Sequence, residues 1–424
     1  MSTSAIEYLN SFAWLGSRPG LERVSELLSR LDKPQNKLKY VHLAGTNGKG
    51  STACFTAEIL QAAGYRTGLF TSPFIHKFNE QMQVNGKMIS NEDLEKVVAK
   101  VKIHADAMED HPTTFELVTA VAFCWFLDEA CDIVVLETGM GGALDSTNVI
   151  KSPEASVITP IDMDHMEFLG KTIADIAKAK AGIIKQDRPV VTAKQHPKAA
   201  AVLAETAANF GTFILEADTV KPGKFSFKGQ KFSCGNFSDL CIKLLGRYQM
   251  DNAALALKTI EILNQQGWNI SGSAIRSGLQ SANWPGRFEL ALENPPTIID
   301  GGHNAQGAIV LADNLKRYFP NKPITFVMGV LADKDVQAIL TPILPLAKQF
   351  YTVTPDSPRA MPAKDLTEII LKQGVAALPM DSIEEALTQA KEFAGDDGVV
   401  CYFGSLYSVG AARIACSDNR PNTA

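Results

Sequence analysis

The sequence has no long apolar run, no excess of basic residues and no paired cysteine motif, and each absence excludes a class of protein. No stretch approaches the roughly 20 apolar residues that span a bilayer, and the first residues lack the basic and apolar regions of a signal peptide. The formal net charge of −5 argues against general binding to nucleic acid or anionic membranes. The seven cysteines include no C-x-x-C pair and have mostly apolar neighbours, which indicates buried thiols rather than zinc ligands. We therefore expect a cytoplasmic protein that binds neither membranes nor nucleic acid.

The 424 residues, 46% of them hydrophobic and 21% charged, have the composition of an ordinary globular protein with two or three domains. Short apolar runs typical of buried parallel strands alternate with longer helical stretches. In the first part of the chain these runs lie at residues 40–44, 65–70, 133–137, 156–159 and 189–192. Residues 218–245 alternate polar and apolar side chains between glycines, which is typical of a small antiparallel sheet.

A break near residue 285, at Trp284-Pro-Gly-Arg287, separates this part from a second alternation of strands and helices. Strand-like runs resume at residues 297–300, 324–329, 350–354 and 399–403. We therefore predict two α/β domains, residues 1–285 and 286–424. The first combines a mostly parallel sheet with a small antiparallel patch, and the second is Rossmann-like.

The most informative feature is a glycine-rich turn at residues 45–52. It follows the apolar run 40–44 and precedes a helical segment at 53–63. In this order, backbone N–H groups, a helix N-terminus and Lys49 are suited to bind nucleotide phosphate, as in a P-loop ATPase domain. Gly50 separates Lys49 from the next serine, so the turn departs from the standard Gly-x-x-x-x-Gly-Lys-[Ser/Thr] pattern and points away from GTPases and motors. The alternative is a glycine-rich turn with an incidental lysine.

Polar side chains follow three of the predicted strands. Glu137 ends an apolar run, Ser72 follows the run at 65–70, and His165 lies beside two aspartates after the run that ends at 159. Open parallel sheets bind ligands at the carboxyl ends of their strands, and a carboxylate beside a phosphate loop is suited to hold Mg²⁺. Alone, Ser72 is more often a turn hydroxyl, and His165 is equally typical of a structural role and of a metal or phosphate role.

Nine short motifs follow one another along the chain. They are Ala44-Gly-Thr-Asn-Gly-Lys-Gly-Ser51, Thr71-Ser-Pro-Phe74 with Phe78-Asn-Glu80, Glu137-Thr-Gly-Met-Gly-Gly142, Asp164-His-Met-Glu-Phe-Leu-Gly170, Lys180-Ala-Gly-Ile-Ile-Lys185, Trp284-Pro-Gly-Arg-Phe288, Asp300-Gly-Gly-His-Asn304, Gly329-Val-Leu-Ala-Asp-Lys-Asp335 and Gly404-Ser-Leu-Tyr407. Together they resemble folylpolyglutamate synthase, the folate branch of the Mur ligase superfamily, including bacterial members that are also dihydrofolate synthases. One departure is that Gly302 and Ala305 stand where the family usually has alanine and proline.

The resemblance implies an ATP-dependent ligase that adds L-glutamate to the carboxylate of a reduced folate through an acyl phosphate, with Mg²⁺ as cofactor. The implied catalytic residues are Lys49, His165, Lys180, Asp300 and His303. The implied metal ligands are Ser72, Glu137, His165 and Lys180. The implied ATP-binding residues are Gly45, Thr46, Asn47, Gly48, Lys49, Gly50, Ser51, Thr52, Asn252, Arg287 and Asp300. These ligases often carry a CO₂-derived carbamate on the lysine that matches Lys180, whereas composition alone indicates a helix with solvated lysines.

By the same resemblance, four residues contact dihydropteroate in bifunctional members: Phe115, Glu116, Asp145 and Ser146. A phenylalanine at a helix start is more often a core residue. Arg18-Pro-Gly20 stands where bifunctional enzymes can carry Asp-Leu-Gly. This departure weakens the case for dihydrofolate synthase activity but not for polyglutamylation.

Two other classes of protein remain as alternatives. A cell-wall Mur ligase uses the same ATP chemistry but carries a further domain of roughly 100 residues before the phosphate loop, for which Gly45 leaves too little chain. A non-catalytic ATP-binding module would not need Asp300 and His303. The alternative role for Arg287 is a hinge salt bridge. We expect domain motion about residues 283–287. A monomer is expected because no apolar seam or heptad repeat is present.

Overall fold

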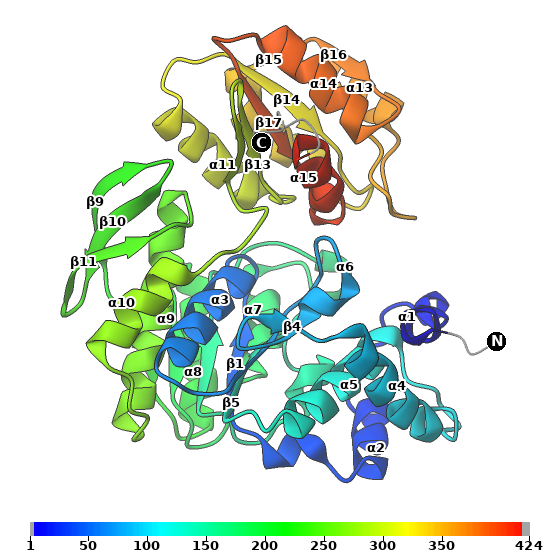
Figure 1. The fold of residues 1–424 in the computed structure, drawn as a ribbon, viewed down its shortest axis with the longest axis vertical. Helices are drawn as coiled ribbons and strands as arrows, with labels where there is room; N and C mark the ends of the chain where they lie inside the picture. The colour runs from blue at the N-terminus through cyan, green and yellow to red at the C-terminus, as the bar shows by residue number, and fades with distance from the viewer. Residues whose placement is uncertain (1–3, 418–424) are drawn as a thin grey trace. The chain divides into compact units, whose positions relative to one another are not determined.

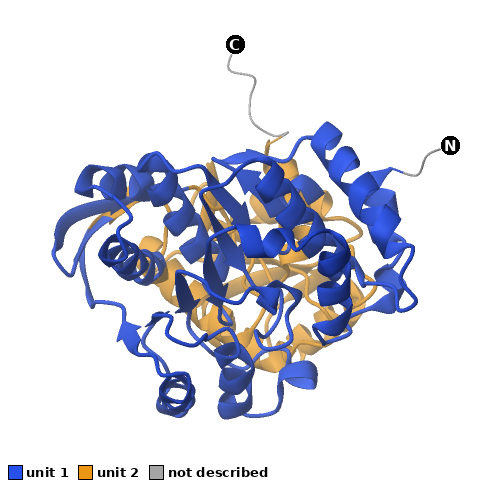
Figure 2. Cartoon of the chain, turned by 90° about the horizontal axis from the view of Figure 1, so that it is seen from below, with its two compact units in different colours: residues 1–223, 231–242, 249–282 blue, residues 224–230, 243–248, 283–424 orange. Residues whose placement is uncertain are grey.

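The structure of the protein is a computed structural model that describes residues 4–417. Within this part the chain forms two compact units (Figure 2). Unit 1 contains the chain up to residue 223 together with residues 231–242 and 249–282. Unit 2 contains residues 224–230, 243–248 and the chain from 283 onward. Two short segments that precede residue 283 therefore belong to unit 2, which the sequence analysis did not foresee.

Unit 1 is built on an eight-stranded sheet with the order β4-β3-β2-β5-β1-β6-β7-β8. Figure 1 labels β1, β4 and β5 of this sheet. Its strands are β1 (Tyr40–Ala44), β2 (Thr67–Phe70), β3 (Met82–Val84), β4 (Lys87–Met88), β5 (Ile133–Glu137), β6 (Ala155–Ile158), β7 (Val190–Thr192) and β8 (Ile214–Glu216). The six neighbouring strands β2-β5-β1-β6-β7-β8 pair in parallel. At the edge of the sheet, β3 pairs antiparallel with β2, and β4 pairs antiparallel with β3. All residues of β1 and β5 are buried, as their continuous apolar character predicts for central parallel strands.

Strand β1 lies where the chain changes direction across this sheet. β2 and β5 lie on one side of it, and β6 to β8 lie on the other. The register aligns Leu43 with Glu137 and Ala44 with Ile158, so three neighbouring strands end at the same level. Open α/β sheets bind ligands at such a switch point.

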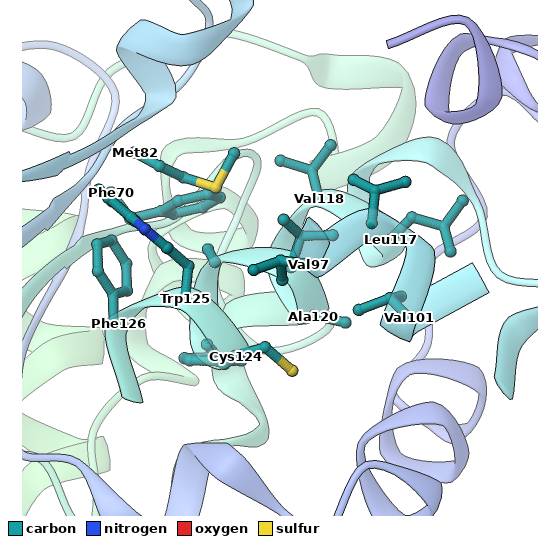
Figure 3. Packing of buried hydrophobic residues seen from close by; sticks show 14 of the residues in the cluster. Phe70, Met82, Val97, Val101, Leu117, Val118, Ala120, Cys124, Trp125 and Phe126 are labelled. Carbon is teal, nitrogen blue, oxygen red and sulfur yellow. The ribbon is translucent and has the colours of Figure 1, made fainter. Parts of the chain in front are cut away.

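The helices of unit 1 include α5, which is apolar on all sides. Eleven of its 15 residues are buried, and it contacts α1, α2 and α4. Figure 3 shows its Phe126 in the same buried cluster as Phe70 of β2 and Val97 of α4. The helices are α1 (Ala5–Asn10), α2 (Glu22–Arg30), α3 (Lys49–Ala62), α4 (Asn91–Ala105), α5 (Thr114–Asp128), α6 (Met166–Leu169), α7 (Ile173–Ala181), α8 (Pro197–Asn209), α9 (Arg247–Gln265) and α10 (Gly272–Ser281).

A separate three-stranded antiparallel sheet is formed by β9 (Val220–Ser226), β10 (Gly229–Cys234) and β11 (Phe237–Ile242). The tip of the β9–β10 hairpin belongs to unit 2. There Phe225 and Phe227 pack against Tyr318, with ring centroids 5.1 and 5.2 Å apart, and the Arg317 guanidinium lies 3.9 Å from the Phe225 ring centre. These aromatic and cation–π contacts explain why a segment so early in the chain folds with unit 2.

Unit 2 is built on a six-stranded sheet with the order β12-β13-β17-β14-β15-β16. The strands are β12 (Glu289–Glu293), β13 (Pro296–Ile299), β14 (Ile324–Met328), β15 (Ala347–Thr352), β16 (Ala377–Pro379) and β17 (Val399–Phe403). Only β12 in this sheet is antiparallel to its neighbour. The helices are α11 (Ala305–Tyr318), α12 (Val336–Ile343), α13 (Ala363–Leu371), α14 (Ile383–Ala394) and α15 (Val409–Ser417). A buried apolar cluster centred on Phe326, Phe350 and Phe403 fills the core.

The predicted fold class is confirmed, and most predicted strands shift by no more than three residues. Two local predictions are wrong. The helix after the glycine-rich turn begins at Lys49 rather than at residue 53, because Gly48 takes the left-handed N-cap position. The run at residues 297–300, the first strand predicted for the second domain, corresponds to β13 rather than to the first strand of its sheet, because the antiparallel strand β12 precedes it; Asp300 follows β13.

Two further observations concern residues 4–417. None of the seven cysteines forms a disulfide there, and all except Cys241 are buried. No helix in this part of the chain has the length and apolar character needed to cross a membrane.

Candidate active site

The glycine-rich turn is pressed closely against the rest of unit 1. A Cβ atom on Gly45 would lie 1.8 Å from Thr159 Oγ1, just after β6. Gly48 has a left-handed φ of +86°, and a Cβ there would lie 2.4 Å from Asn252 Oδ1 on α9. Only glycine fits both positions, so the turn has little freedom to move.

The N–H groups of this turn are divided between two tasks. Those of Thr46 and Asn47 donate to the Pro160 carbonyl oxygen at 2.9 and 3.3 Å, and so hold the turn against the segment after β6. The first turn of α3, beginning at Lys49, presents the N–H groups that a helix leaves without an intrahelical partner. These groups and the helix dipole favour an anion. The N–H groups that remain for an anion are therefore those at the start of α3, whereas those of Thr46 and Asn47 hold the turn in place.

Two lysines converge on one carbonyl oxygen beside the turn. Lys180 Nζ donates to Gly45 O at 2.7 Å, and Lys49 Nζ donates to the same oxygen at 3.3 Å. Lys49 Nζ also lies 3.8 Å from Glu137 Oε1 at the end of β5. The structure thus brings together three residues, from β5, α3 and α7, that the sequence analysis assigned to one site.

Lys180 is almost completely buried, with 3% of its surface exposed, so the interpretation as a solvated lysine is wrong. Burial, and then the positive charge of Lys49, lower the pKa of Lys180 from 10.5 to about 7. The charges of Asp164 and Asp145 act in the opposite direction. At neutral pH a large share of Lys180 is therefore the neutral, nucleophilic amine.

Two buried side chains of α9 support the phosphate turn. Gln249 Nε2 donates to Ser51 Oγ at 3.2 Å, and Asn252 Nδ2 donates to Gln249 Oε1 at 3.0 Å. The Asn252 side chain also packs closely against the turn at Gly48, as described above. Thr52 Oγ1 is buried and has no hydrogen-bond partner among residues 4–417, which suits a ligand of the turn. Gln249 was not predicted from the sequence, because a glutamine on a helix belongs to no recognisable motif.

Asp145 fixes a second loop, residues 138–145, which follows β5. Its carboxylate accepts hydrogen bonds from Met140 N at 2.9 Å, from Thr147 N at 3.0 Å and from Thr147 Oγ1 at 2.6 Å. Burial raises the pKa of Asp145, and these hydrogen bonds oppose the rise. The Asp145 carboxylate therefore holds the loop 138–145 in its conformation.

Asn148 joins this loop to the end of α7. Its Nδ2 donates to Ala143 O at 3.0 Å and to Gly182 O at 3.1 Å, and its Oδ1 accepts from Lys185 Nζ at 2.8 Å. Ala143 N in turn donates to the Ala179 carbonyl oxygen at 2.7 Å. The segment that carries Lys180 is thus held to the loop after β5.

The other proposed metal ligands lie near this edge but do not form a protein-only metal cluster. His165 is the N-cap of α6, its side chain is 37% exposed, and its Nε2 lies 3.9 Å from Asp164 Oδ2. Ser72 lies two residues beyond Phe70, which pairs with Leu136 in the neighbouring strand β5. Within the described ranges, no group of three or more His, Cys, Asp and Glu residues is arranged to hold a metal ion.

Two of the residues assigned to the pterin are engaged in packing and hydrogen bonding. The Phe115 ring covers Gly139, where a Cβ would lie 2.5 Å from Phe115 Cζ. Ser146 Oγ lies 3.1 Å from Thr119 Oγ1 on α5. Both residues lie beside the loop 138–145.

Glu116 is committed to the start of α5. Its Oε2 accepts from Thr113 N at 2.7 Å in a capping box, and from Arg23 Nε at 3.1 Å in a buried ion pair. Arg18, in the segment that departs from the bifunctional pattern, pairs with Asp110 at 2.8 Å. The charges of Arg18 and Arg23 are thus both paired with acidic side chains.

In unit 2, three of the proposed residues lie around the end of β13. Asp300 is buried, and its two oxygens accept from Phe288 N at 2.8 Å and from Gly302 N at 2.7 Å. Burial raises the pKa of Asp300, and the charge of Arg287 opposes the rise. His303 Nδ1 lies 3.0 Å from the Gly301 carbonyl oxygen. Because a carbonyl oxygen can only accept a hydrogen bond, Nδ1 is the protonated nitrogen that donates it. His303 also directly precedes Asn304, the N-cap of α11.

Known proteins match this chain over almost its whole length. Two family models match, the Mur ligase middle domain over residues 43–260 and the Mur ligase glutamate ligase domain over residues 286–406. A dihydrofolate synthase/folylpolyglutamate synthase of Bacillus subtilis is 39% identical over 430 residues, which cover 96% of this chain and 98% of that protein. A folylpolyglutamate synthase of Lacticaseibacillus casei is 38% identical over 428 residues, 97% of each chain.

Solved structures show the same relationship. Mycobacterium tuberculosis folylpolyglutamate synthase, complexed with ADP and AMPPCP, has a TM-score of 0.90 at 30% identity, with 99% of this chain and 100% of that chain covered. The resemblance inferred from the motifs is confirmed. The chain belongs to the folylpolyglutamate synthase family of the Mur ligases.

Proposed function

We propose that this protein is an ATP-dependent ligase that joins L-glutamate to the carboxylate of a reduced folate. The observation that carries the proposal is the convergence of Lys49, Glu137 and Lys180 beside a phosphate turn. Relatives that match along the whole chain and are named folylpolyglutamate synthases support the substrates. The glutamate ligase family model over residues 286–406 supports glutamate binding by the second domain, which we place at 286–424.

In the first step, a folate carboxylate oxygen attacks the γ-phosphorus of ATP. A new O–P bond forms, and the bond to the β,γ-bridging oxygen breaks, so ADP leaves with that electron pair. Lys49 and the first-turn N–H groups of α3 offset the negative charge on the transferring group. We assign the ATP contacts to residues 45–52, with Asn252, Arg287 and Asp300 as further contacts.

In the second step, the neutral amine of glutamate attacks the acyl carbon. An amide C–N bond forms, inorganic phosphate leaves with the electron pair of the C–O bond, and the amine loses a proton. We propose that His303 holds this proton. Because its Nδ1 donates to the Gly301 carbonyl oxygen, the neutral imidazole keeps its acceptor nitrogen at Nε2. Asp300, which fixes Phe288 and Gly302, positions this segment.

The oxygen-rich groups at the end of the unit 1 sheet suit Mg²⁺. The Glu137 carboxylate and the hydroxyls of Ser72 and Thr52 are hard oxygen ligands, and Thr52 Oγ1 has no other partner among the described residues. When bound, Mg²⁺ offsets charge on the β- and γ-phosphate oxygens. We propose that these residues hold it together with phosphate oxygens, and that His165 and Lys180 serve a second position.

We also propose that Lys180 carries a CO₂-derived carbamate. The nitrogen lone pair attacks the carbon of CO₂, one C=O π pair moves to oxygen, and the nitrogen releases a proton. Burial and Lys49 favour the neutral amine that this reaction requires. The product is an anion, which the positive charge of Lys49 attracts, whereas a protonated Lys180 would be repelled by Lys49. Asp145 and Asp164 act against the anion, so Lys49 must outweigh them.

Dihydrofolate synthase activity is a second candidate, because the Bacillus subtilis relative is named for both reactions. Phe115, Glu116, Asp145 and Ser146 are the proposed pterin contacts. Glu116 already caps helix α5 and pairs with Arg23. Phe115 is the aromatic residue of the four, and we propose that it stacks on the pterin ring. A monomeric state and a cytoplasmic location stay predictions.

Phosphate release from ATP tests the proposal. We expect release only when both tetrahydrofolate and L-glutamate are present, and release with dihydropteroate and glutamate would establish the second activity. Lys180→Met should abolish turnover, whereas Lys178→Met, at an exposed position on the same helix, should leave it unchanged. No release with any folate would refute the proposed function.

A further inference from the structure

The motif Phe78-Asn-Glu80 has no role in the proposed chemistry, yet Glu80 holds the loop that follows β2. Its Oε2 accepts from Ile75 N at 2.8 Å and from His76 N at 3.2 Å. Its Oε1 accepts from His76 N and Lys77 N, both at 3.1 Å. Three successive N–H groups therefore surround one carboxylate, an arrangement that resembles a backbone anion nest.

The same loop is closed at its base by the sheet. Thr71 N donates to the Gln81 carbonyl oxygen at 3.0 Å, beside the pairing of Phe70 with Met82 between β2 and β3. Glu80 N also donates to the Lys77 carbonyl oxygen at 3.0 Å. Only residues 72–74 lie between the two fixed points, Thr71 and Ile75. So short a stretch has few conformations, and it includes Ser72.

We propose that Glu80 is a positioning residue that holds Ser72 in place to bind the metal ion of the nucleotide. The proposal rests on the metal role of Ser72 in the proposed function. Glu80 acts through the backbone of residues 75–77 and does not itself bind the metal. A hydroxyl is a weak metal ligand, so its contribution depends on being held at the right place before the metal arrives.

Glu80→Gln is a sharp test because the amide keeps one acceptor oxygen and replaces the other by a donor. In either orientation the NH₂ group faces an N–H donor, that of Ile75 or that of Lys77, so at least one hydrogen bond is lost and the others are no longer charge-assisted. The readout is the dissociation constant of Mn²⁺ for the enzyme–ADP complex, measured by electron paramagnetic resonance without turnover. Glu92→Gln, at an exposed carboxylate in the first turn of α4, is the matched control.

We expect Glu80→Gln to weaken Mn²⁺ binding about tenfold, the effect of losing one charged hydrogen bond, and Glu92→Gln to leave it unchanged. In a Ser72→Ala background, Glu80→Gln should change the constant less than twofold, because the hydroxyl that it positions is absent. Equal factors in the two backgrounds would overturn the proposal, as would a Ser72→Ala variant with wild-type Mn²⁺ affinity. If Glu80→Gln does not fold, Glu80→Asp, which keeps both oxygens but is one methylene shorter, replaces it in the same cycle.

The proposed function fails separately from this inference. It fails if the wild-type protein releases no phosphate with any folate and glutamate. A wild-type enzyme that is active, but in which Glu80→Gln acts equally with and without the Ser72 hydroxyl, contradicts the positioning role alone.

Discussion

The pH dependence of stability offers a direct test of the environment of Lys180. Its pKa of about 7 in the folded protein lies below the ordinary value of 10.5. Between these two pH values the unfolded chain binds one proton that the folded chain does not, so the free energy of unfolding rises with pH. Below about pH 7 both states are protonated at this residue, and the cost of burying the charge is present in full. Lys180→Met removes this contribution, so the variant should lack that part of the rise.

The expected magnitude follows from the size of the shift. A change from 10.5 to about 7 corresponds to about 5 kcal/mol at 1.36 kcal/mol per pKa unit, an upper estimate for a buried group. From pH 7 to 10, the wild-type protein should therefore gain about 1.4 kcal/mol per pH unit relative to Lys180→Met. The lost hydrogen bond to Gly45 O adds a difference that changes little with pH. The slope, and not the offset, measures the shifted pKa.

Urea unfolding of both proteins in CO₂-free buffer from pH 6 to 10 measures this slope. Each resolved transition is fitted by itself, because a chain with two units need not unfold in one step. Parallel stability profiles for the two proteins would refute the depressed pKa. Adding bicarbonate at pH 8 should stabilise the wild-type protein and leave Lys180→Met unchanged, because a group added only to the folded state stabilises it. An equal response in both proteins would refute a carbamate on Lys180.

Three other substitutions have clear expected outcomes. Gly142→Ala places a Cβ 2.9 Å from the Lys180 carbonyl oxygen and should lower the rate of phosphate release at least tenfold. Gly272→Ala, where a Cβ meets nothing within 4 Å, is the control and should leave the rate unchanged; equal rates in the two variants would refute the tight contact at Gly142. Asp300→Asn should lower the free energy of unfolding by about 1–3 kcal/mol in urea, because its NH₂ group faces a backbone N–H; an unchanged value would contradict this. Gln249→Leu should raise the KM for ATP several-fold with little change in kcat, since Ser51 loses its support, and an unaltered KM would count against that role.

The fold and the location of the site could be predicted from the sequence because both depend on patterns of neighbouring residues along the chain. Continuous apolar runs mark the central parallel strands, and residues at the ends of such strands meet at one edge of the sheet. This reasoning brought Glu137 and Lys49 together, and the structure places them 3.8 Å apart. The polar contacts that hold the site could not be predicted in this way. Gln249 and Ser51 are 198 residues apart, and no periodicity links a glutamine of one helix to a serine in the first turn of another.

The burial of Lys180 shows how two sequence motifs can be halves of one contact. A Cβ on Gly142 would lie 3.1 Å from the Lys180 Cα, and a Cβ on Gly182 would lie 2.3 Å from the Ala143 Cα. Without side chains at these glycines, the loop after β5 and the end of α7 approach backbone to backbone, and Ala143 N reaches the Ala179 carbonyl oxygen. This close approach excludes water from Lys180 and directs it to Gly45 O, 2.7 Å away. Gly142 and Gly182 therefore serve to bring the two segments together, in addition to any contact with a ligand. We expect larger side chains at these positions to separate the segments, expose Lys180 to solvent and return its pKa towards the ordinary value.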